Sequence, residues 1–156
     1  MADGQRLFLR DWPLPQARGA VLIVHGLGEH SGRYQWLARW FNQRGYAVRS
    51  YDQRGHGRTP GQRGALRHRD DLLEDLASVY NDYSNGLPHA PLLLGHSMGG
   101  LVALRSTLDG RITPPALLLS SPALRSWESP WLIKLAGMLN RVVPNLPLRN
   151  GLDSDK

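Results

Sequence analysis

Cysteine is absent from the 156-residue sequence, which excludes disulfide bonds, thiolate metal sites and a cysteine nucleophile. Long apolar runs are also lacking, since no stretch approaches the roughly 18 residues that a membrane-spanning helix needs. The opening stretch MADGQRLFLRDWP carries an acid at Asp3 and no apolar signal region, so we expect no signal peptide. These absences favour a cytoplasmic protein and leave peripheral contact with a membrane open.

Basic residues outnumber acidic ones, 19 Lys and Arg against 13 Asp and Glu, which gives a net charge of +6. The bases are mostly arginines scattered from Arg6 to Arg149 rather than clustered. Scattered charge is typical of a solvated surface, so we expect no nucleic-acid partner. With 41% apolar and 21% charged residues, the chain resembles a soluble globular domain. Neither a cofactor nor an oligomeric state is indicated.

Short β-rich runs alternate with amphipathic helical stretches along the chain. This alternation predicts an α/β fold, with a mostly parallel sheet covered by helices on both faces. The predicted strands are RLFLRDW (6–12), AVLIVHG (20–26), YAVRSYD (46–52), LLLGH (92–96) and PALLLSSP (115–122).

A first helix is predicted from aromatic and apolar residues that recur at helical spacing before Gly45. We expect all of these side chains to pack in the core: Tyr34, Trp36, Leu37, Trp40 and Phe41.

A second helix is predicted to begin at Asp70 or Asp71, either of which can cap it. A third is predicted from about Met98 to Leu108. The apolar residues of the second helix share one face: Leu72, Leu76, Val79, Tyr80 and Tyr83.

Gly95-His96-Ser97-Met98-Gly99 fits the pattern G-x-S-x-G and stands directly between a predicted buried strand and a helix. A strand that turns at once into a helix strains the residue at the turn, so its neighbours must lack Cβ. The turn also exposes the hydroxyl, and the N-terminal amides of the helix favour a developing negative charge. Ser97 is therefore the candidate nucleophile; the alternative is a glycine-rich turn with an incidental serine.

An oxyanion hole needs a second amide, and the loop HGLGEHSGRY (25–34) follows a neighbouring strand. The backbone N–H groups of Leu27 and Met98 are the candidate donors. We interpret the side chains of His25, Glu29 and His30 as a hydrogen-bonded brace of this turn.

A metal site is not predicted. His25, His30 and His56 lie in loops, and their spacing does not resemble the helical H-E-x-x-H pattern of zinc enzymes.

The stretches HGLGEHSGRY, YDQRGHGRT and GHSMGG together resemble α/β hydrolases of the monoacylglycerol lipase, lysophospholipase and serine aminopeptidase-like group. Their order and spacing match, and the resemblance covers nearly the whole chain. It implies that Ser97 attacks the carbonyl of a lipid ester, with the oxyanion hole at Leu27 and Met98. YDQRGHG matches a structural loop, so Asp52 and His56 are expected to have no catalytic role.

The resemblance also implies a domain division. It places a lipid-accepting cap after what the family counts as the sixth strand, so we expect residues 1–125 to be the N-terminal part of the core. Residues 126–156 are then the start of an incomplete cap. Trp131, Leu135 and Met138 form an apolar face there that is expected to bind an acyl chain, unless it packs on its own domain.

In this fold the catalytic acid and base follow the serine in the sequence. This chain departs from that pattern, because neither is found after Ser97 in the expected loops. Glu128, Asp153 and Asp155 lie within or beside the expected cap rather than in an acid loop. We therefore expect the front part of a longer enzyme, inactive by itself; a base at His56 or His25 is the alternative. The six histidines all precede Ser97: His25, His30, His56, His68, His89 and His96.

Two alternatives from other classes remain. GLGEHSG (26–32) follows a strand and Asp52 ends the next one, as in a nucleotide-binding domain. Its glycines are spaced G-x-G-x-x-x-G rather than G-x-G-x-x-G, and this alternative leaves GHSMGG unexplained. A non-catalytic, hydrolase-like binding module is also compatible with the missing base.

Overall fold

The computed structural model of the protein describes residues 4–124. Ser97 lies in a compact unit that runs from Met1 to Pro122. The predicted boundary between residues 1–125 and 126–156 falls at the limit of the described residues and stays a prediction. The expected acyl-binding face of Trp131, Leu135 and Met138 lies outside them.

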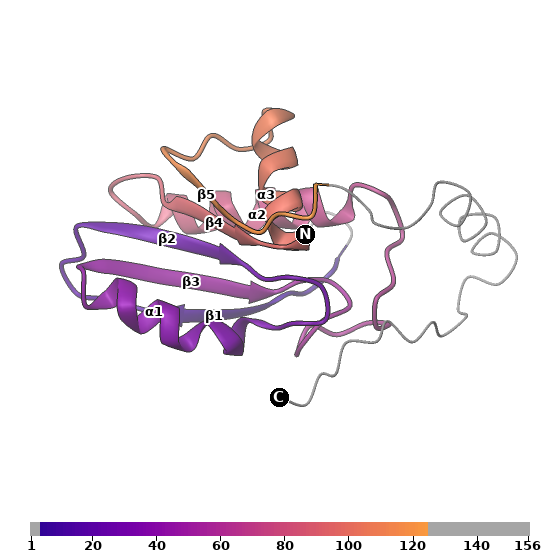
Figure 1. Ribbon diagram of the computed structural model, residues 1–156, viewed down its shortest axis with the longest axis horizontal. Coiled ribbons are helices and arrows are strands. Elements are labelled where there is room, and N and C mark those ends of the chain that lie inside the picture. The colour runs from indigo at the N-terminus through magenta and orange to yellow at the C-terminus, as the bar shows by residue number, and fades with distance from the viewer. Residues whose placement is uncertain (1–3, 125–156) are drawn as a thin grey trace, which may run out of the picture. The chain divides into compact units, whose positions relative to one another are not determined.

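A five-stranded sheet forms the centre of this unit, with the strand order β1-β3-β2-β4-β5 (Figure 1). Strand β1 pairs antiparallel with β3, and the other pairs are parallel. The mostly parallel sheet and each predicted strand are thereby confirmed. The strands are β1 (Phe8–Trp12), β2 (Gly19–Val24), β3 (Tyr46–Asp52), β4 (Leu92–His96) and β5 (Leu117–Ser120).

Helices cover both faces of the sheet, as predicted. The short 3-10 helix η1 (Ser31–Tyr34) leads into α1 (Gln35–Asn42) on one face. Helices α2 (Asp71–Asn85) and α3 (Met98–Leu108) pack on the other (Figure 1).

Strand β2 is buried on both faces, which explains its continuous apolar sequence. Successive side chains point to opposite faces of a strand, so its residues belong alternately to two core clusters. Val21 and Ile23 pack with Ala38 and Phe41 of α1. The other cluster joins the sheet to α2 and α3 and includes Leu22, Val24, Leu76, Val79, Leu93 and Val102.

Two of the aromatic residues predicted to lie in the core do not. Trp36 is 74% exposed and Trp40 is 40% exposed, whereas Phe41 is buried. The reason is the helical period of 3.6 residues, which places positions 36 and 40 on the side of α1 roughly opposite buried Ala38. Core packing is therefore wrong for both tryptophans. It is confirmed for Phe41, and Tyr34 and Leu37 pack against the same cluster.

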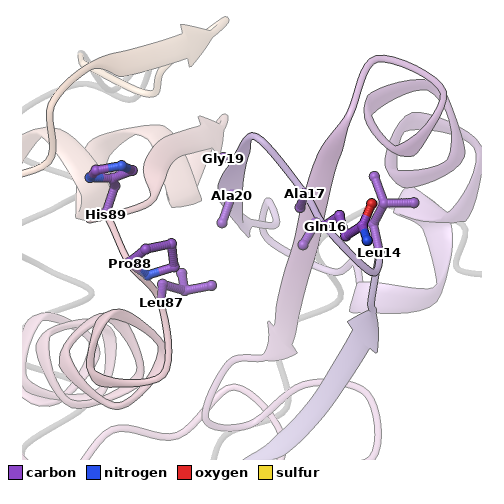
Figure 2. Close-up of a pocket in the computed structure, with 9 residues that line it drawn as sticks. Leu14, Gln16, Ala17, Gly19, Ala20, Leu87, Pro88 and His89 are labelled. Atoms are coloured by element: carbon purple, nitrogen blue, oxygen red, sulfur yellow. The ribbon is translucent and has the colours of Figure 1, made fainter.

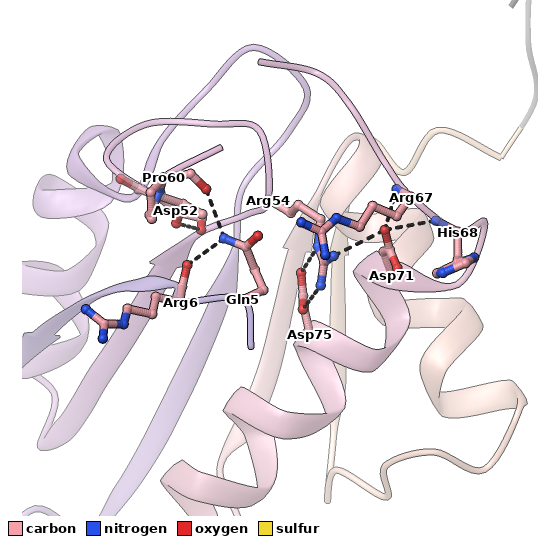
Figure 3. A network of polar contacts seen from close by, with 10 residues as sticks. Gln5, Arg6, Asp52, Arg54, Pro60, Arg67, His68, Asp71 and Asp75 are labelled. Atoms are coloured by element: carbon pink, nitrogen blue, oxygen red, sulfur yellow. Dashed lines mark hydrogen bonds and ion pairs between the residues drawn. The ribbon is translucent and has the colours of Figure 1, made fainter. Parts of the chain in front are cut away.

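The start of α2 also differs from the prediction. Asp70 precedes the helix, but its side chain makes no capping hydrogen bond. The Asp71 carboxylate instead accepts hydrogen bonds from the backbone N–H groups of Arg67 and His68, in the loop before the helix (Figure 3). Neither aspartate is therefore a conventional N-cap, because the fold uses Asp71 to hold the loop.

Strand β5 is an edge of the sheet within the described residues. Leu118 and Leu119 are 39% and 37% exposed, which leaves apolar surface in contact with water. In residues 4–124, none of the helices has the length and apolar character needed to span a membrane.

Candidate active site

Ser97 occupies the turn between β4 and α3 with a φ of 51° and a ψ of −118°. A positive φ is unusual for a residue with a side chain and indicates a strained backbone. The Ser97 N–H donates to the Ser120 carbonyl at 3.0 Å, and the Ser97 carbonyl accepts from the Leu101 N–H at 3.1 Å. The strained turn expected of a nucleophile elbow is therefore present, held by β5 and by the first turn of α3.

The glycines around Ser97 allow close packing of this turn. A Cβ atom at Gly95 would lie 2.5 Å from the Gly99 carbonyl oxygen. A Cβ atom at Gly99 would overlap the carbonyl oxygens of Val24 and His25. Both neighbours are backbone and cannot move aside, so these two positions require glycine.

The loop after β2 packs directly against the elbow. A Cβ atom at Gly26 would lie 3.2 Å from the Ser97 Cβ atom. In the part of the chain that the structure describes, the N–H groups of Leu27 and Met98 have no hydrogen-bond acceptor. Within residues 4–124 the two candidate oxyanion donors are therefore free, and the segments that carry them meet at Ser97.

His25 is fully buried and both of its ring nitrogens are hydrogen-bonded. Its Nε2 accepts from the Gln53 N–H at 3.0 Å, and its Nδ1 lies 2.7 Å from the Gly26 carbonyl oxygen. Since Nε2 is the acceptor, Nδ1 carries the proton and donates it to Gly26. Burial lowers the pKa of His25 to about 4 despite this bond, so the ring is neutral at neutral pH.

Glu29 holds the other side of Gly26. Its Oε2 accepts from the Gly26 N–H at 2.9 Å and from the Tyr34 hydroxyl at 2.8 Å, and Arg33 lies 3.3 Å from Oε1. Burial opposes the charge, but these contacts outweigh it and hold the pKa of Glu29 below its usual value. His30 caps η1 by accepting from the Gly32 N–H. The brace predicted for the three side chains is thus confirmed.

Across residues 4–124, no histidine is hydrogen-bonded to the Ser97 hydroxyl. His56 faces the Arg54 carbonyl, with 3.0 Å between Nδ1 and the oxygen. His96 faces β5, with its Nδ1 3.1 Å from the Ser120 carbonyl oxygen. Both ring nitrogens of His25 are engaged and His56 Nδ1 faces Arg54, so neither alternative base is hydrogen-bonded to the Ser97 hydroxyl in the described residues.

Asp52 organises the loops at the carboxyl end of β3. Its Oδ1 accepts from the Ser31 N–H and its Oδ2 from the Arg58 N–H, each at 2.7 Å. Burial opposes ionisation, yet these hydrogen bonds hold the pKa of Asp52 below its usual value. A carboxylate that holds one backbone N–H group on each oxygen fits the structural role expected for this motif.

Sequence reasoning missed two partners in this region. Gln53 supplies the N–H that fixes the His25 tautomer, and Arg54 forms a buried ion pair with Asp75 of α2 (Figure 3). The sequence did contain a signal for the pair of Arg54 with Asp75. Asp75 lies one turn after Asp71 and one residue before Leu76, on the apolar side of the helix, where a buried carboxylate needs a cation.

Among the cavities lined by described residues, two lie at opposite ends of the strands. One, of about 270 Å³, is at the amino ends of β2 and β3 and is lined by mostly small or apolar residues (Figure 2). The other, of about 320 Å³, lies beside the elbow, at the carboxyl ends, where open α/β sheets bind their ligands. The described residues hold no cluster suited to a metal ion. The second cavity is lined by Glu29, Arg33, Tyr34, Trp36, Leu37, Leu94, His96 and Ser120.

The sequence profile of the family described as "Serine aminopeptidase, S33" matches residues 15–156. This chain belongs to that family. The match confirms the resemblance inferred from the three motifs and favours a hydrolase over a nucleotide-binding domain.

Relatives of this S33-family chain include monoacylglycerol lipases. It is 37% identical over 158 residues to the monoacylglycerol lipase of Mycolicibacterium smegmatis, covering 97% of this chain and 55% of that protein. It is 39% identical over 155 residues to the human monoglyceride lipase, covering 94% and 50%. The crystal structure of Paleococcus ferrophilus monoacylglycerol lipase aligns with a TM-score of 0.78 at 37% identity, covering 95% and 56%. The fold is therefore that of an α/β hydrolase, and the chain spans about half the length of the curated relatives it matches.

Proposed function

We propose that the protein containing this chain is a serine hydrolase that cleaves carboxylic esters through an acyl-serine intermediate at Ser97. The observation that carries the proposal is the strained Ser97 at the N-terminus of α3, beside two N–H groups that have no acceptor among the described residues. The serine oxygen attacks the ester carbonyl, and the N–H groups of Leu27 and Met98 stabilise the oxyanion that forms. The alcohol then leaves, and water hydrolyses the acyl-serine.

The reaction also needs a general base, because a serine hydroxyl is a weak nucleophile near neutral pH. Every histidine of the chain precedes Ser97, and within the described residues none is hydrogen-bonded to the Ser97 hydroxyl. The proposal therefore assigns the base and its acid to sequence outside these 156 residues.

The proposed substrates are lipid esters with a single acyl chain, such as monoacylglycerols or lysophospholipids. Two relatives are named monoacylglycerol or monoglyceride lipases, and a third, 33% identical, is phospholipase YtpA of Bacillus subtilis. The apolar face of Trp131, Leu135 and Met138 is proposed to line the acyl channel. Such a substrate brings the protein to a membrane surface, which makes peripheral membrane contact part of the proposal.

A fluorophosphonate probe tests the nucleophile, because labelling requires an activated serine. The full-length gene product should be labelled, and its Ser97→Ala variant should fold equally well and remain unlabelled. An unlabelled wild type would instead identify a non-catalytic, hydrolase-like binding module.

The substrate class is tested by parallel assays of monoacylglycerol, a short aryl ester and a peptide amide. We expect the highest kcat/KM with monoacylglycerol. A clear preference for the amide would contradict the proposed class.

A further inference from the structure

Both backbone polar groups of Gly26 are held by side chains. The carbonyl accepts the Nδ1 proton of buried His25 at 2.7 Å and, in a longer bond, the Glu29 N–H at 3.4 Å, while the Gly26 N–H donates to the Glu29 carboxylate at 2.9 Å. Gly26 also lies against the Ser97 side chain, where an added Cβ atom would make a tight contact of 3.2 Å with the Ser97 Cβ atom. The residue before the candidate oxyanion donor Leu27 is therefore fixed in position and in rotation.

The Gly26 carbonyl and the Leu27 N–H belong to one trans peptide group, so they point in opposite directions. The carbonyl points inward to the buried His25 ring, and the N–H consequently points away from it, on a residue that is exposed. We propose that His25 is a positioning residue, whose Nδ1–H holds the Gly26 carbonyl and thereby aims the Leu27 N–H at the substrate oxyanion. This inference rests on the proposed function of Ser97.

The proton must be on Nδ1 for this role, and the fold fixes it there. Gln53 presents its N–H to Nε2, which a protonated Nε2 could not accept. The Gln53 side chain also donates to the His25 carbonyl at 2.6 Å, so ring and backbone are held together. That same carbonyl faces Gly99 at the start of α3, which links the loop to the segment that carries Met98. His25 therefore contacts both segments that carry the proposed donors, the loop with Leu27 and the start of α3 with Met98.

Replacing His25 should lower kcat by less than the removal of a whole oxyanion donor does. Removing one oxyanion donor costs about 10² to 10³ in kcat. A donor that remains but is free to rotate should cost about 10-fold to 100-fold, in kcat rather than in KM, because the bond matters most in the transition state.

Two amide variants separate the two ring nitrogens. His25→Asn places an N–H₂ donor near the position of Nδ1 and lacks the Nε2 acceptor. His25→Gln places its amide oxygen near Nε2 and lacks the donor at Nδ1. If His25 only fills space, both variants should lose stability and activity together. If His25 aims the Leu27 N–H, the kcat of His25→Asn should stay within about threefold of the wild-type value. The kcat of His25→Gln should then fall by about 10-fold to 100-fold, with KM nearly unchanged.

The experiment uses the full-length gene product, with thermal melts to show that each variant is folded. Nitrogen-15 NMR of the His25 ring gives an independent readout that needs no turnover. Protonated Nδ1 and unprotonated Nε2, with the kcat difference between the variants, would support the proposal. A proton on Nε2, or equal kcat values for His25→Asn and His25→Gln, would overturn it even in an active enzyme. Absence of Ser97-dependent turnover in the wild type would instead remove the proposed function, and this role with it.

Discussion

Arg54 and Asp75 form a two-bond ion pair inside the protein, with Nε 3.0 Å from Oδ2 and Nη2 2.8 Å from Oδ1. Both side chains are almost completely buried, and Asp71 adds a second carboxylate 3.3 Å from the Arg54 guanidinium. The pair connects the segment after β3 to α2 (Figure 3). Arg54 directly follows Gln53, so the same anchor steadies the partner of His25.

Asp75→Ala should therefore destabilise the protein strongly. It removes the carboxylate that makes two bonds to the buried Arg54 guanidinium, and breaking a buried pair costs about 3 to 5 kcal/mol. The free energy of unfolding in urea is the measurement. Asp109→Ala, which breaks the exposed pair of Asp109 with Arg105, is the matched control and should leave the unfolding midpoint almost unchanged. Equal effects of the two variants would contradict a structural role for the buried pair.

Gly99→Ala should destabilise the elbow, because the new methyl group overlaps the carbonyl oxygens of Val24 and His25. Overpacking against backbone that cannot move typically costs about 1 to 3 kcal/mol. The control is Gly86→Ala at the end of α2, where φ is −91° and only one atom lies within contact distance of the new Cβ atom. In urea, Gly99→Ala should unfold at a lower concentration than Gly86→Ala. An unchanged midpoint for Gly99→Ala would contradict the close packing of the elbow.

Stability should fall on acidification because of His25. Its pKa is about 4 in the folded protein against about 6.5 for an ordinary histidine, so between these values the unfolded chain binds a proton that the folded chain does not. The resulting slope is about 1.4 kcal/mol per pH unit, which gives full stability above about pH 6.5 and a loss of about 3 kcal/mol by about pH 4. Urea unfolding at about pH 7 and pH 5 measures it. His25→Asn does not titrate and should lose less stability over that interval, while Asp52 and Glu29 act only at lower pH. Parallel losses in the two proteins would show that other groups cause the effect.

Residues 1–156 expressed alone should show no ester turnover and should associate or aggregate. In the described part no histidine is hydrogen-bonded to the Ser97 hydroxyl, and an oxyanion hole with binding leaves only about 10³ to 10⁴ of acceleration over water. The edge of β5 and the exposed Leu118 and Leu119 also favour association. Sedimentation and esterase assays beside the full-length gene product check this. A monomeric segment with comparable turnover would show that a histidine of the chain acts as the base.

The sequence alone determined the features that depend on neighbouring residues. The apolar run of β2 predicted a strand buried on both faces, and the glycines around Ser97 predicted the strained turn, because each pattern reflects a steric requirement of its own segment. The order of strands and helices followed from the same local patterns. The exposed side of α1 and the cap of α2 were predicted wrongly, because a list of residues does not state which side of a helix meets the sheet or which loop a carboxylate holds.

The tertiary structure decided which distant residues meet. Gln53 is 28 residues from His25, and Asp75 is 21 residues from Arg54, so no local pattern pairs them. The protonation state of His25 depends on burial by the whole fold, and its tautomer depends on one backbone N–H at the end of another strand. Local sterics fix the turn that presents Ser97, but long-range contacts fix the direction of the groups around it, because each is held by a partner that only the folded sheet brings near.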